Sequence, residues 1–221
     1  MTGLRERNKA KRVAAILDAA VELLGEHPLD DVTTEQIAAV ADVSPATVYN
    51  LVGPRDELLR AIVARVVDDL VAEVARASAG DDDPVAVAEL VVEWSVGAFT
   101  ANSLAYRRIV AAGRSVGARR DGVIDPSQLQ VAALRRAREL GVLRGDVDPA
   151  GLGRQVYLSW IGSMEHWAEG RLDDRGFSVA TRHGLFTVLA AAAAEPHRER
   201  FLAELRRLGV ELESCWSAPP G

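Results

Sequence analysis

Residues 33–59 read TTEQIAAVADVSPATVYNLVGPRDELL and contain the signals of two short helices followed by the start of a longer one. Thr33 can accept a hydrogen bond from the backbone N–H of Gln36 while the Gln36 side chain bonds back to Thr33, which is a capping box. Ser44 and Pro45 then start another helix, because a hydroxyl suits the N-cap and a proline loses no hydrogen bond at the first helical position. The stretch predicts a helix ending near Ala41, a tight turn, and a second helix over 45–51.

Longer helices are expected on both sides of this pair. Residues 13–24 carry apolar side chains at helical spacing and predict a first helix, which His27-Pro28 ends. Gly53-Pro54 breaks the chain again and opens a long fourth helix with a continuous apolar stripe. Two short helices at a tight turn suit a helix-turn-helix, in which one helix braces against the DNA backbone and the next lies in the major groove.

The rest of the chain also reads as helices. Aromatic residues make up only 5% of the 221 residues, and alanine, leucine, valine, arginine and glutamate dominate, so the composition favours helices over sheets. Gly80 to Pro84 is expected to end the fourth helix and to cap the fifth with Asp83, and residues 170–176 are expected to form a loop. Glycine, proline and aspartate then delimit six further helices, over residues 84–100, 104–116, 126–140, 149–168 and 178–194 and after Pro196. We predict an all-α fold.

Charge is distributed unevenly. The chain has 26 basic and 32 acidic residues and a net charge of −6, which argues against indiscriminate binding to nucleic acid. The first twelve residues differ, because five basic side chains against Glu6 alone give them a charge of +4. These basic residues are Arg5, Arg7, Lys9, Lys11 and Arg12.

Several classes of protein are not supported. The single Cys215 excludes an internal disulfide framework, and the four histidines lack metal-ligand spacing, so no metal and no cofactor are expected. The charged N-terminus does not read as a signal peptide and the longest apolar run is too short to cross a bilayer, which predicts a cytoplasmic protein without a membrane partner. No nucleophile with a base, no paired carboxylates in an apolar setting and no phosphate-binding glycine loop point to an enzyme.

The stretch with its flanks, roughly residues 10–60, resembles the tetracycline-repressor (TetR) family of transcriptional regulators. The matching positions are Thr33, Ile37-Ala38, Ala41 to Ser44, Tyr49 and Arg55. The chain departs from the family pattern at four positions, with Asp42 and Ala46 in place of glycine, Val52 in place of phenylalanine and Arg55 in place of lysine. Aspartate tolerates the left-handed backbone that the turn favours, so Asp42 is compatible with it.

The resemblance implies an N-terminal helix-turn-helix DNA-binding domain in residues 1–53. Thr34, Tyr49 and Arg55 would contact phosphates, helped by backbone amides at the start of the fourth helix. The third helix would contact base edges, with Asn50 as a hydrogen-bonding group. The basic N-terminal arm would add minor-groove or phosphate contacts. Tyr49 could instead be a partly buried packing residue. The candidate DNA-binding residues are Thr33, Thr34, Ser44, Pro45, Ala46, Thr47, Tyr49, Asn50 and Arg55.

Residues 54–221 would then form a helical ligand-binding and dimerisation domain. The family pairs its last two major helices with those of a second subunit, and residues 184–194 offer more apolar surface than a small monomer is expected to hide. Aromatic side chains and one methionine are the candidate sensor residues, although three of the aromatics and the methionine share one helical face, and such a stripe is more often core or dimer seam. The candidates are Trp94, Phe99, Tyr106, Tyr157, Trp160, Met164 and Trp167.

The sequence is therefore interpreted as a repressor that binds a palindromic double-stranded DNA operator as a homodimer and is released by a small apolar or aromatic effector. The effector would favour a state in which the fourth helices move the two reading heads apart. Two alternatives stay open. The chain could be a helical protein-interaction adaptor whose helix-turn-helix is only a packing arrangement, or a DNA-binding regulator without a small-molecule ligand.

Overall fold

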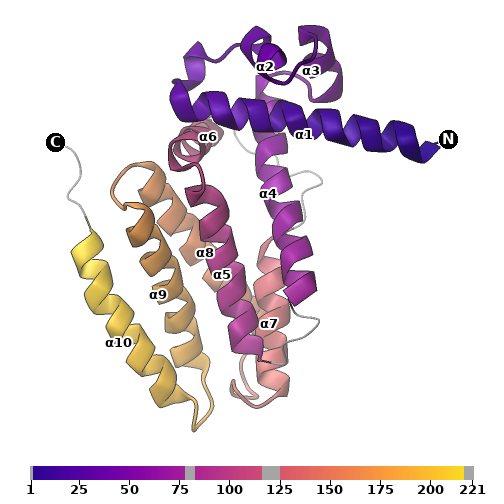
Figure 1. Ribbon diagram of the computed structural model, residues 1–221. Coiled ribbons are helices and arrows are strands. Elements are labelled where there is room, and N and C mark those ends of the chain that lie inside the picture. Colours follow the sequence, from indigo (N-terminus) through magenta and orange to yellow (C-terminus); the bar gives the residue numbers. More distant parts are fainter. Residues whose placement is uncertain (1, 78–82, 116–124, 217–221) are drawn as a thin grey trace. The chain divides into compact units, whose positions relative to one another are not determined.

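The computed structural model describes residues 2–77, 83–115 and 125–216, and within these ranges the chain is helical with one isolated β-bridge, Leu143 to Ala193. The all-α fold is confirmed (Figure 1). The elements are α1 (Thr2–Glu26), η1 (Leu29–Asp31), α2 (Thr34–Val40), α3 (Pro45–Leu51), α4 (Arg55–Ala77), α5 (Pro84–Thr100), α6 (Ser103–Ser115), α7 (Ser127–Glu139), α8 (Pro149–Ala168), α9 (Asp174–Ala192) and α10 (Arg198–Cys215).

The chain divides into two compact units. Unit 1 comprises residues 1–66 and 99–121, and unit 2 comprises residues 67–98 and 122–221. The division falls inside α4 and inside α5, so it does not coincide with the boundary at residue 53 expected from sequence. That functional boundary stays a prediction.

Unit 1 is built on α1. The helices α2, α3 and α6 pack against it, and its buried side includes Ile16, Ala20 and Leu24, each at most 1% exposed. Arg108 of α6 donates hydrogen bonds to the carbonyl oxygens of Leu24 (2.6 Å) and His27 (2.7 Å). The Leu24 carbonyl belongs to the last turn of α1, where the helix itself supplies no partner, and His27 directly follows the helix. The arginine therefore fixes the C-terminal end of α1 to α6.

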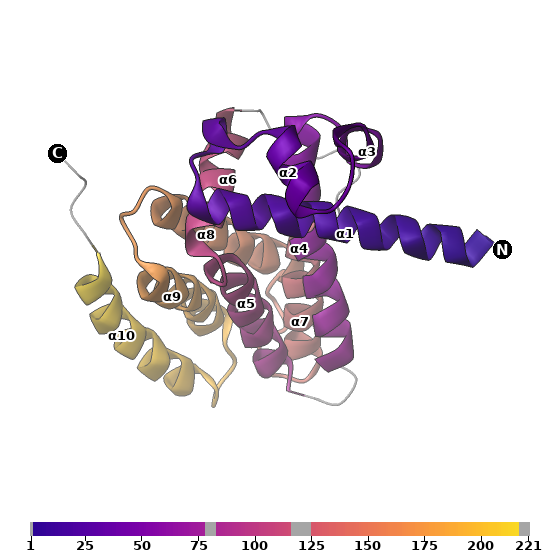
Figure 2. The ribbon, with the colours of Figure 1, turned by 45° about the horizontal axis from the view of Figure 1, so that its top comes forward.

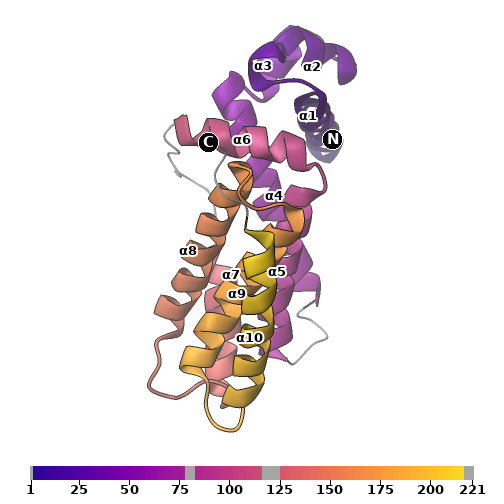
Figure 3. The same ribbon diagram turned by 90° about the vertical axis from the view of Figure 1, so that its left-hand side faces the viewer.

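Unit 2 is a bundle in which α7 packs on α8, α8 on α9, and α9 on α10 (Figure 3). Its core joins side chains from these helices and from α5, and the side chains of Leu134, Leu185 and Phe201 are fully buried. A glycine sets the α7–α8 distance, because a Cβ at Gly153 would lie 2.8 Å from the Cα of Val131. Backbones can approach this closely only where one residue has no side chain.

The helix α9 corrects two expectations from the sequence. It begins at Asp174, inside the stretch expected to be a loop, because the Asp173 carboxylate accepts a hydrogen bond from the Gly176 N–H (2.6 Å) and caps it. Its apolar residues are also covered within the chain: Leu185, Val188, Leu189 and Ala192 are all buried. The expected surplus of apolar surface on this helix was wrong, since α8, α10 and the core take it up.

The other predicted helices lie within a few residues of their observed bounds, and Asp83 caps α5 as expected. One difference matters for function: α1 starts at Thr2, so the basic N-terminal segment is helical. The predicted ends of the fourth helix at Gly80 and the sixth at Val116 lie outside the described residues. No single described helix is long and apolar enough to cross a membrane. Taken together, α5 and α6 reach that length and apolar composition, but a sharp bend separates them.

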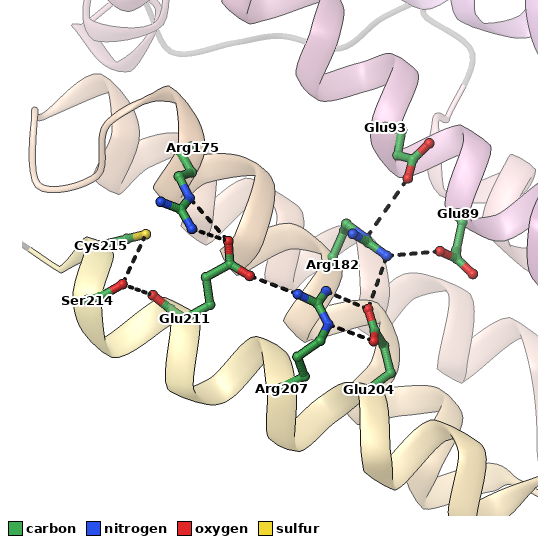
Figure 4. Close-up of polar contacts among 9 residues, drawn as sticks. All are labelled: Glu89, Glu93, Arg175, Arg182, Glu204, Arg207, Glu211, Ser214 and Cys215. Atoms are coloured by element: carbon green, nitrogen blue, oxygen red, sulfur yellow. Dashed lines mark hydrogen bonds and ion pairs between the residues drawn. The ribbon is translucent and has the colours of Figure 1, made fainter.

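A row of ion pairs ties three helices of unit 2 together (Figure 4). Arg182 of α9 lies between Glu89 of α5 (3.3 Å) and Glu204 of α10 (3.1 Å). Arg207 bonds both Glu204 and Glu211 on α10, at 2.7 and 2.9 Å, so the charges alternate along the row. The row orients α10 on α9 and α5.

Candidate nucleic-acid interface

The capping box at the start of α2 is confirmed in both directions. The Thr33 N–H donates to Oε1 of Gln36 (2.7 Å), and the Gln36 N–H donates to Oγ1 of Thr33 (3.2 Å). Ile37 and Ala38 are buried against the rest of unit 1. Thr33 and Thr34 are exposed at the N-terminal end of the helix. The Thr33 hydroxyl is engaged in the cap, so Thr34 is the threonine left to face a ligand.

The turn between α2 and α3 has the expected left-handed residue. Asp42 has φ = 52°, which makes it the one described non-glycine residue with positive φ. The Val43 N–H then donates to the carbonyl oxygen of Ala38 (2.9 Å) and closes the turn. This bond returns the chain so that α3 can follow directly. The geometry fixes the angle between the two short helices.

The helix α3 is held by its cap and by one buried residue. Oγ of Ser44 accepts a hydrogen bond from the Thr47 N–H (3.2 Å) and lies 2.8 Å from the Thr47 hydroxyl. Val48 is the buried residue, 3% exposed. Pro45, Ala46 and Asn50 are exposed, and Thr47 is partly buried. Most of this helix therefore faces away from the rest of unit 1.

Tyr49 lies on the exposed side of α3. Its side chain is 64% exposed, whereas a packing tyrosine would bury most of its ring. The alternative in which Tyr49 is a partly buried packing residue is therefore wrong. Pro45, Ala46 and Asn50 are exposed as well, so the Tyr49 hydroxyl can donate a hydrogen bond to a ligand that lies against α3.

Arg55 begins α4, two residues after Gly53, whose φ of 102° turns the chain out of α3. Its guanidinium lies 3.4 Å from the carboxylate of Asp30, and the two side chains are 43% and 96% exposed. Such an exposed pair contributes at most about 1 kcal/mol, so it leaves Arg55 available to a phosphate. Sequence reasoning missed Asp30 because the two residues are far apart along the chain.

Two acidic residues share this first turn of α4. The carboxylates of Asp56 and Glu57 interact favourably with the positive end of the helix dipole. The Arg60 guanidinium bonds Glu57 at 2.7 Å and holds the pKa of that carboxyl below its usual range. Both carboxylates would repel a phosphate, so Arg55 rather than the helix amides is the stronger phosphate group here.

Two of the candidate sensor residues lie in unit 1. Phe99 and Tyr106 are 4% and 6% exposed, and their ring centroids are 5.1 Å apart. Trp94 lies in unit 2, where it packs against Leu70, Val74 and Val91. The seven candidates are therefore divided between the two units.

The remaining candidate sensor residues lie on α8. Tyr157 and Trp160 stack with ring centroids 6.2 Å apart, and Trp160 and Trp167 both contact the ring of Phe177 on α9. Trp167 is fully buried and its Nε1–H donates to Oδ1 of Asp174 (2.7 Å). Met164 and Tyr157 are partly buried. Phe177 was missed by the sequence reading because its partners come from another helix.

Unit 2 also has an open groove of about 570 Å³ between α5, α9 and α10. Four residues of the row of ion pairs line it, together with two aromatic side chains: Glu89, Arg182, Glu204, Arg207, Phe186 and Phe201. None of the seven candidate sensor residues lines it. Within the described residues, no group of three or more histidine, cysteine, aspartate or glutamate side chains is placed to hold a metal ion.

A known protein family matches the segment that contains α2, α3 and Arg55. The sequence model of the family described as "Bacterial regulatory proteins, tetR family" matches residues 16–62, which contain α2, α3 and the first turns of α4. No similar sequence is found among the curated proteins.

Solved structures extend the likeness to most of the chain. SmeT, the repressor of the Stenotrophomonas maltophilia multidrug efflux pump SmeDEF, is 29% identical, with a TM-score of 0.65 over 84% of this chain and 92% of SmeT. A SmeT–triclosan complex matches with 26% identity and a TM-score of 0.61, over 85% and 94% of the two chains. Thermus thermophilus FadR, a TetR-family repressor solved with lauroyl-CoA, shares the fold at 21% identity and a TM-score of 0.62, over 83% and 96%. The family match over residues 16–62 and the shared fold together support a TetR-family transcriptional regulator.

Proposed function

We propose that this protein is a transcriptional repressor that binds a palindromic operator as a homodimer and is released by a small apolar or aromatic effector. The observation that carries the proposal is the exposed side of α3, where Tyr49 is 64% exposed and only Val48 is buried. A capped seven-residue helix that buries so little has few packing reasons to exist, and a major groove accepts it.

Phosphate contacts would position the protein and α3 would read the sequence. Thr34, Tyr49 and Arg55 are exposed around α3 and carry the donors that phosphate oxygens accept. The helix itself has no arginine or lysine, so Asn50 is the group suited to an adenine edge. Pro45 and Ala46 offer apolar contact to thymine methyl groups. We expect an operator whose reading depends on adenine and thymine.

A palindrome requires two recognition helices about one helical turn apart, which a two-fold symmetric dimer provides. Because α9 is covered within the chain, we propose that α8 supplies the contact surface. Leu158 is 60% exposed, and Gly162, one turn later, has open space where a side chain would be. An exposed leucine beside a glycine would let the same helix of a second copy approach closely. Leu158→Arg should shift the dimer to a monomer in analytical ultracentrifugation.

The effector is proposed from the relatives and from α8. SmeT was solved with triclosan and FadR with lauroyl-CoA, both of which have large apolar parts. In this chain the half-buried Tyr157, Trp160 and Met164 give α8 an aromatic and polarisable surface that could receive such a molecule. Triclosan is the first probe. Quenching of tryptophan fluorescence that Trp160→Phe removes, together with loss of operator binding, would support this part of the proposal.

A mobility shift on the DNA that flanks the protein's own gene tests operator binding. Arg55→Ala should weaken binding about tenfold or more, because it removes a phosphate contact from each subunit. Arg76→Ala is the matched control, since it removes the same charge from the far end of the same helix, where Arg76 is 72% exposed. If Arg55→Ala and Tyr49→Ala both bind as the native protein does, DNA binding through α3 is wrong, and an adaptor role gains support.

A further inference from the structure

A short helical turn sets an acidic side chain beside the proposed DNA contact. The segment η1 joins the end of α1 to α2, and α2 and α3 lie on one side of α1 (Figure 2). Two backbone hydrogen bonds close η1. The Asp31 N–H donates to the Pro28 carbonyl oxygen (3.0 Å), and the Val32 N–H donates to the Leu29 carbonyl oxygen (3.4 Å). The turn is therefore held by backbone atoms and does not need the side chain of Asp30.

The Asp30 carboxylate pairs with Arg55, although the two residues are far apart along the chain. Its Oδ1 lies 3.4 Å from Nη2 of the arginine, and the carboxylate is 96% exposed. Asp31, the next residue, is exposed as well but forms no ion pair within the residues that the structure describes. Of two adjacent aspartates, one is thus placed against the arginine and the other is not.

The surroundings of Arg55 make Asp30 its main anionic neighbour. Glu57 is bonded to Arg60 at 2.7 Å, so its charge is already balanced. In the described part of the chain, the ion pair of Arg55 is the one with Asp30. A guanidinium donates to carboxylate oxygens and to phosphate oxygens in the same way. The carboxylate is therefore a competitor for the group that would bind a DNA phosphate.

The size of this competition follows from the exposure of the pair. An exposed ion pair favours the paired state by about fivefold at most, so a phosphate can displace Asp30. A phosphate on the same guanidinium would lie roughly 6 Å from the carboxylate, and like charges at that distance in water disfavour each other by about threefold. Salt screens carboxylates beyond about 8 Å, so more distant ones contribute less. We expect about threefold for each subunit and about tenfold for a dimer.

We propose that Asp30 competes with DNA phosphate for Arg55 and so weakens the binding of this protein to DNA of any sequence. This rests on the proposed DNA binding by α3 and Arg55. Because a phosphate contact carries no sequence information, the weakening is the same on operator and non-operator DNA. The base contacts of α3 then supply a larger share of operator affinity than they would beside an unopposed arginine.

The experiment compares two asparagine variants of the full chain. Asp30→Asn removes the competing charge and keeps the size of the side chain, while Asp31→Asn removes the same charge from the exposed neighbour that has no ion pair. Both are made in the native chain and in the Arg55→Ala variant. Mobility shifts at about 0.1 M salt use the operator duplex and a duplex of equal length with a scrambled sequence. Circular dichroism checks that each variant folds.

In the native chain, Asp30→Asn should tighten binding to both duplexes about tenfold, and Asp31→Asn by less than about threefold. In the Arg55→Ala variant the two substitutions should have equal and small effects, because the arginine that Asp30 opposes is gone. An Asp30→Asn effect that persists there, or equal effects of the two substitutions in the native chain, would overturn the proposal in favour of general repulsion. Weaker binding by Asp30→Asn would overturn it by showing that Asp30 positions Arg55 for the phosphate.

Failure of the proposed function would look different. Native protein that binds neither duplex would overturn the proposed function itself. Operator binding that Arg55→Ala leaves unchanged would overturn only the role of Arg55, and with it the competition by Asp30.

Discussion

Asp42 has a backbone conformation that few residue types tolerate. Asp42 has φ = 52° at the turn that sets α3 against α2. Aspartate can adopt this region because its short polar side chain bonds locally, while a β-branched residue collides with its own backbone. The residue type that departs from the family pattern is thus still one that the turn accepts.

Replacing Asp42 therefore has opposite expected effects according to the new residue. Asp42→Val should lower the free energy of unfolding by about 1–2 kcal/mol, since valine is strained at positive φ. Asp42→Gly should leave it unchanged or slightly higher, because glycine has no such strain. Urea unfolding followed by circular dichroism measures both. Equal destabilisation by the two substitutions would show that the carboxylate, and not the backbone conformation, stabilises the turn.

Individual helices could be predicted from local chemistry, but their partners could not. Thr33 with Gln36 and Ser44 with Pro45 specify where α2 and α3 begin, because a cap needs only three or four neighbouring residues. The bonds from Arg108 to the end of α1 depend on a partner more than eighty residues away. Such contacts leave no local pattern in a single sequence.

The sequence predicted neither the cover over α9 nor the start of α1 at Thr2, and the two reasons are related. An apolar helix reads the same whether its cover comes from the same chain or from a second copy, so the composition of residues 184–194 could not identify α8 and α10 as its cover. The helical structure of residues 3–12 was missed because the first helix was located from apolar spacing, and these residues have nothing to bury. Helix propensity alone continues α1 through them.

The crossing of α7 and α8 should be sensitive to a single methyl group. At Gly153 a Cβ would lie 2.7 Å from the backbone nitrogen of Val131, so Gly153→Ala forces the two helices apart and should cost about 1–3 kcal/mol. Gly97 of α5 has open space at its Cβ, and Gly97→Ala should stabilise by up to about 1 kcal/mol through helix propensity. Thermal unfolding compares the two. A loss at Gly97 equal to that at Gly153 would contradict the close approach.

For the whole molecule, the row of ion pairs in unit 2 predicts opposite pH responses from two glutamates. Burial raises the pKa of Glu89 above its ordinary value of 4.5, despite Arg182 beside it. The hydrogen bond from Arg207 lowers the pKa of Glu204. A carboxyl group whose pKa is raised in the folded protein stabilises the fold below about pH 4.5 and loses that contribution as the pH rises. A carboxyl group whose pKa is lowered stabilises the fold above this pH and loses that contribution in acid.

Glu89→Gln should therefore gain stability relative to the native protein as the pH rises from about 4 to 7, because it removes a charge that burial disfavours. Glu204→Gln should lose stability relative to the native protein over the same range, because its carboxylate contributes most when ionised. Melting temperatures across this range measure both differences. Shifts of the same sign in the two variants would contradict the assigned causes.

The central claim is that two copies of α3 read a palindrome, and footprinting of the DNA flanking the protein's own gene tests it most directly. We predict two protected half-sites whose centres lie about one helical turn, or a multiple of it, apart. Protection should weaken steeply with salt and should be lost in Arg55→Ala but not in Arg76→Ala. Protection without sequence preference at low salt, or equal loss in the two variants, would contradict the account.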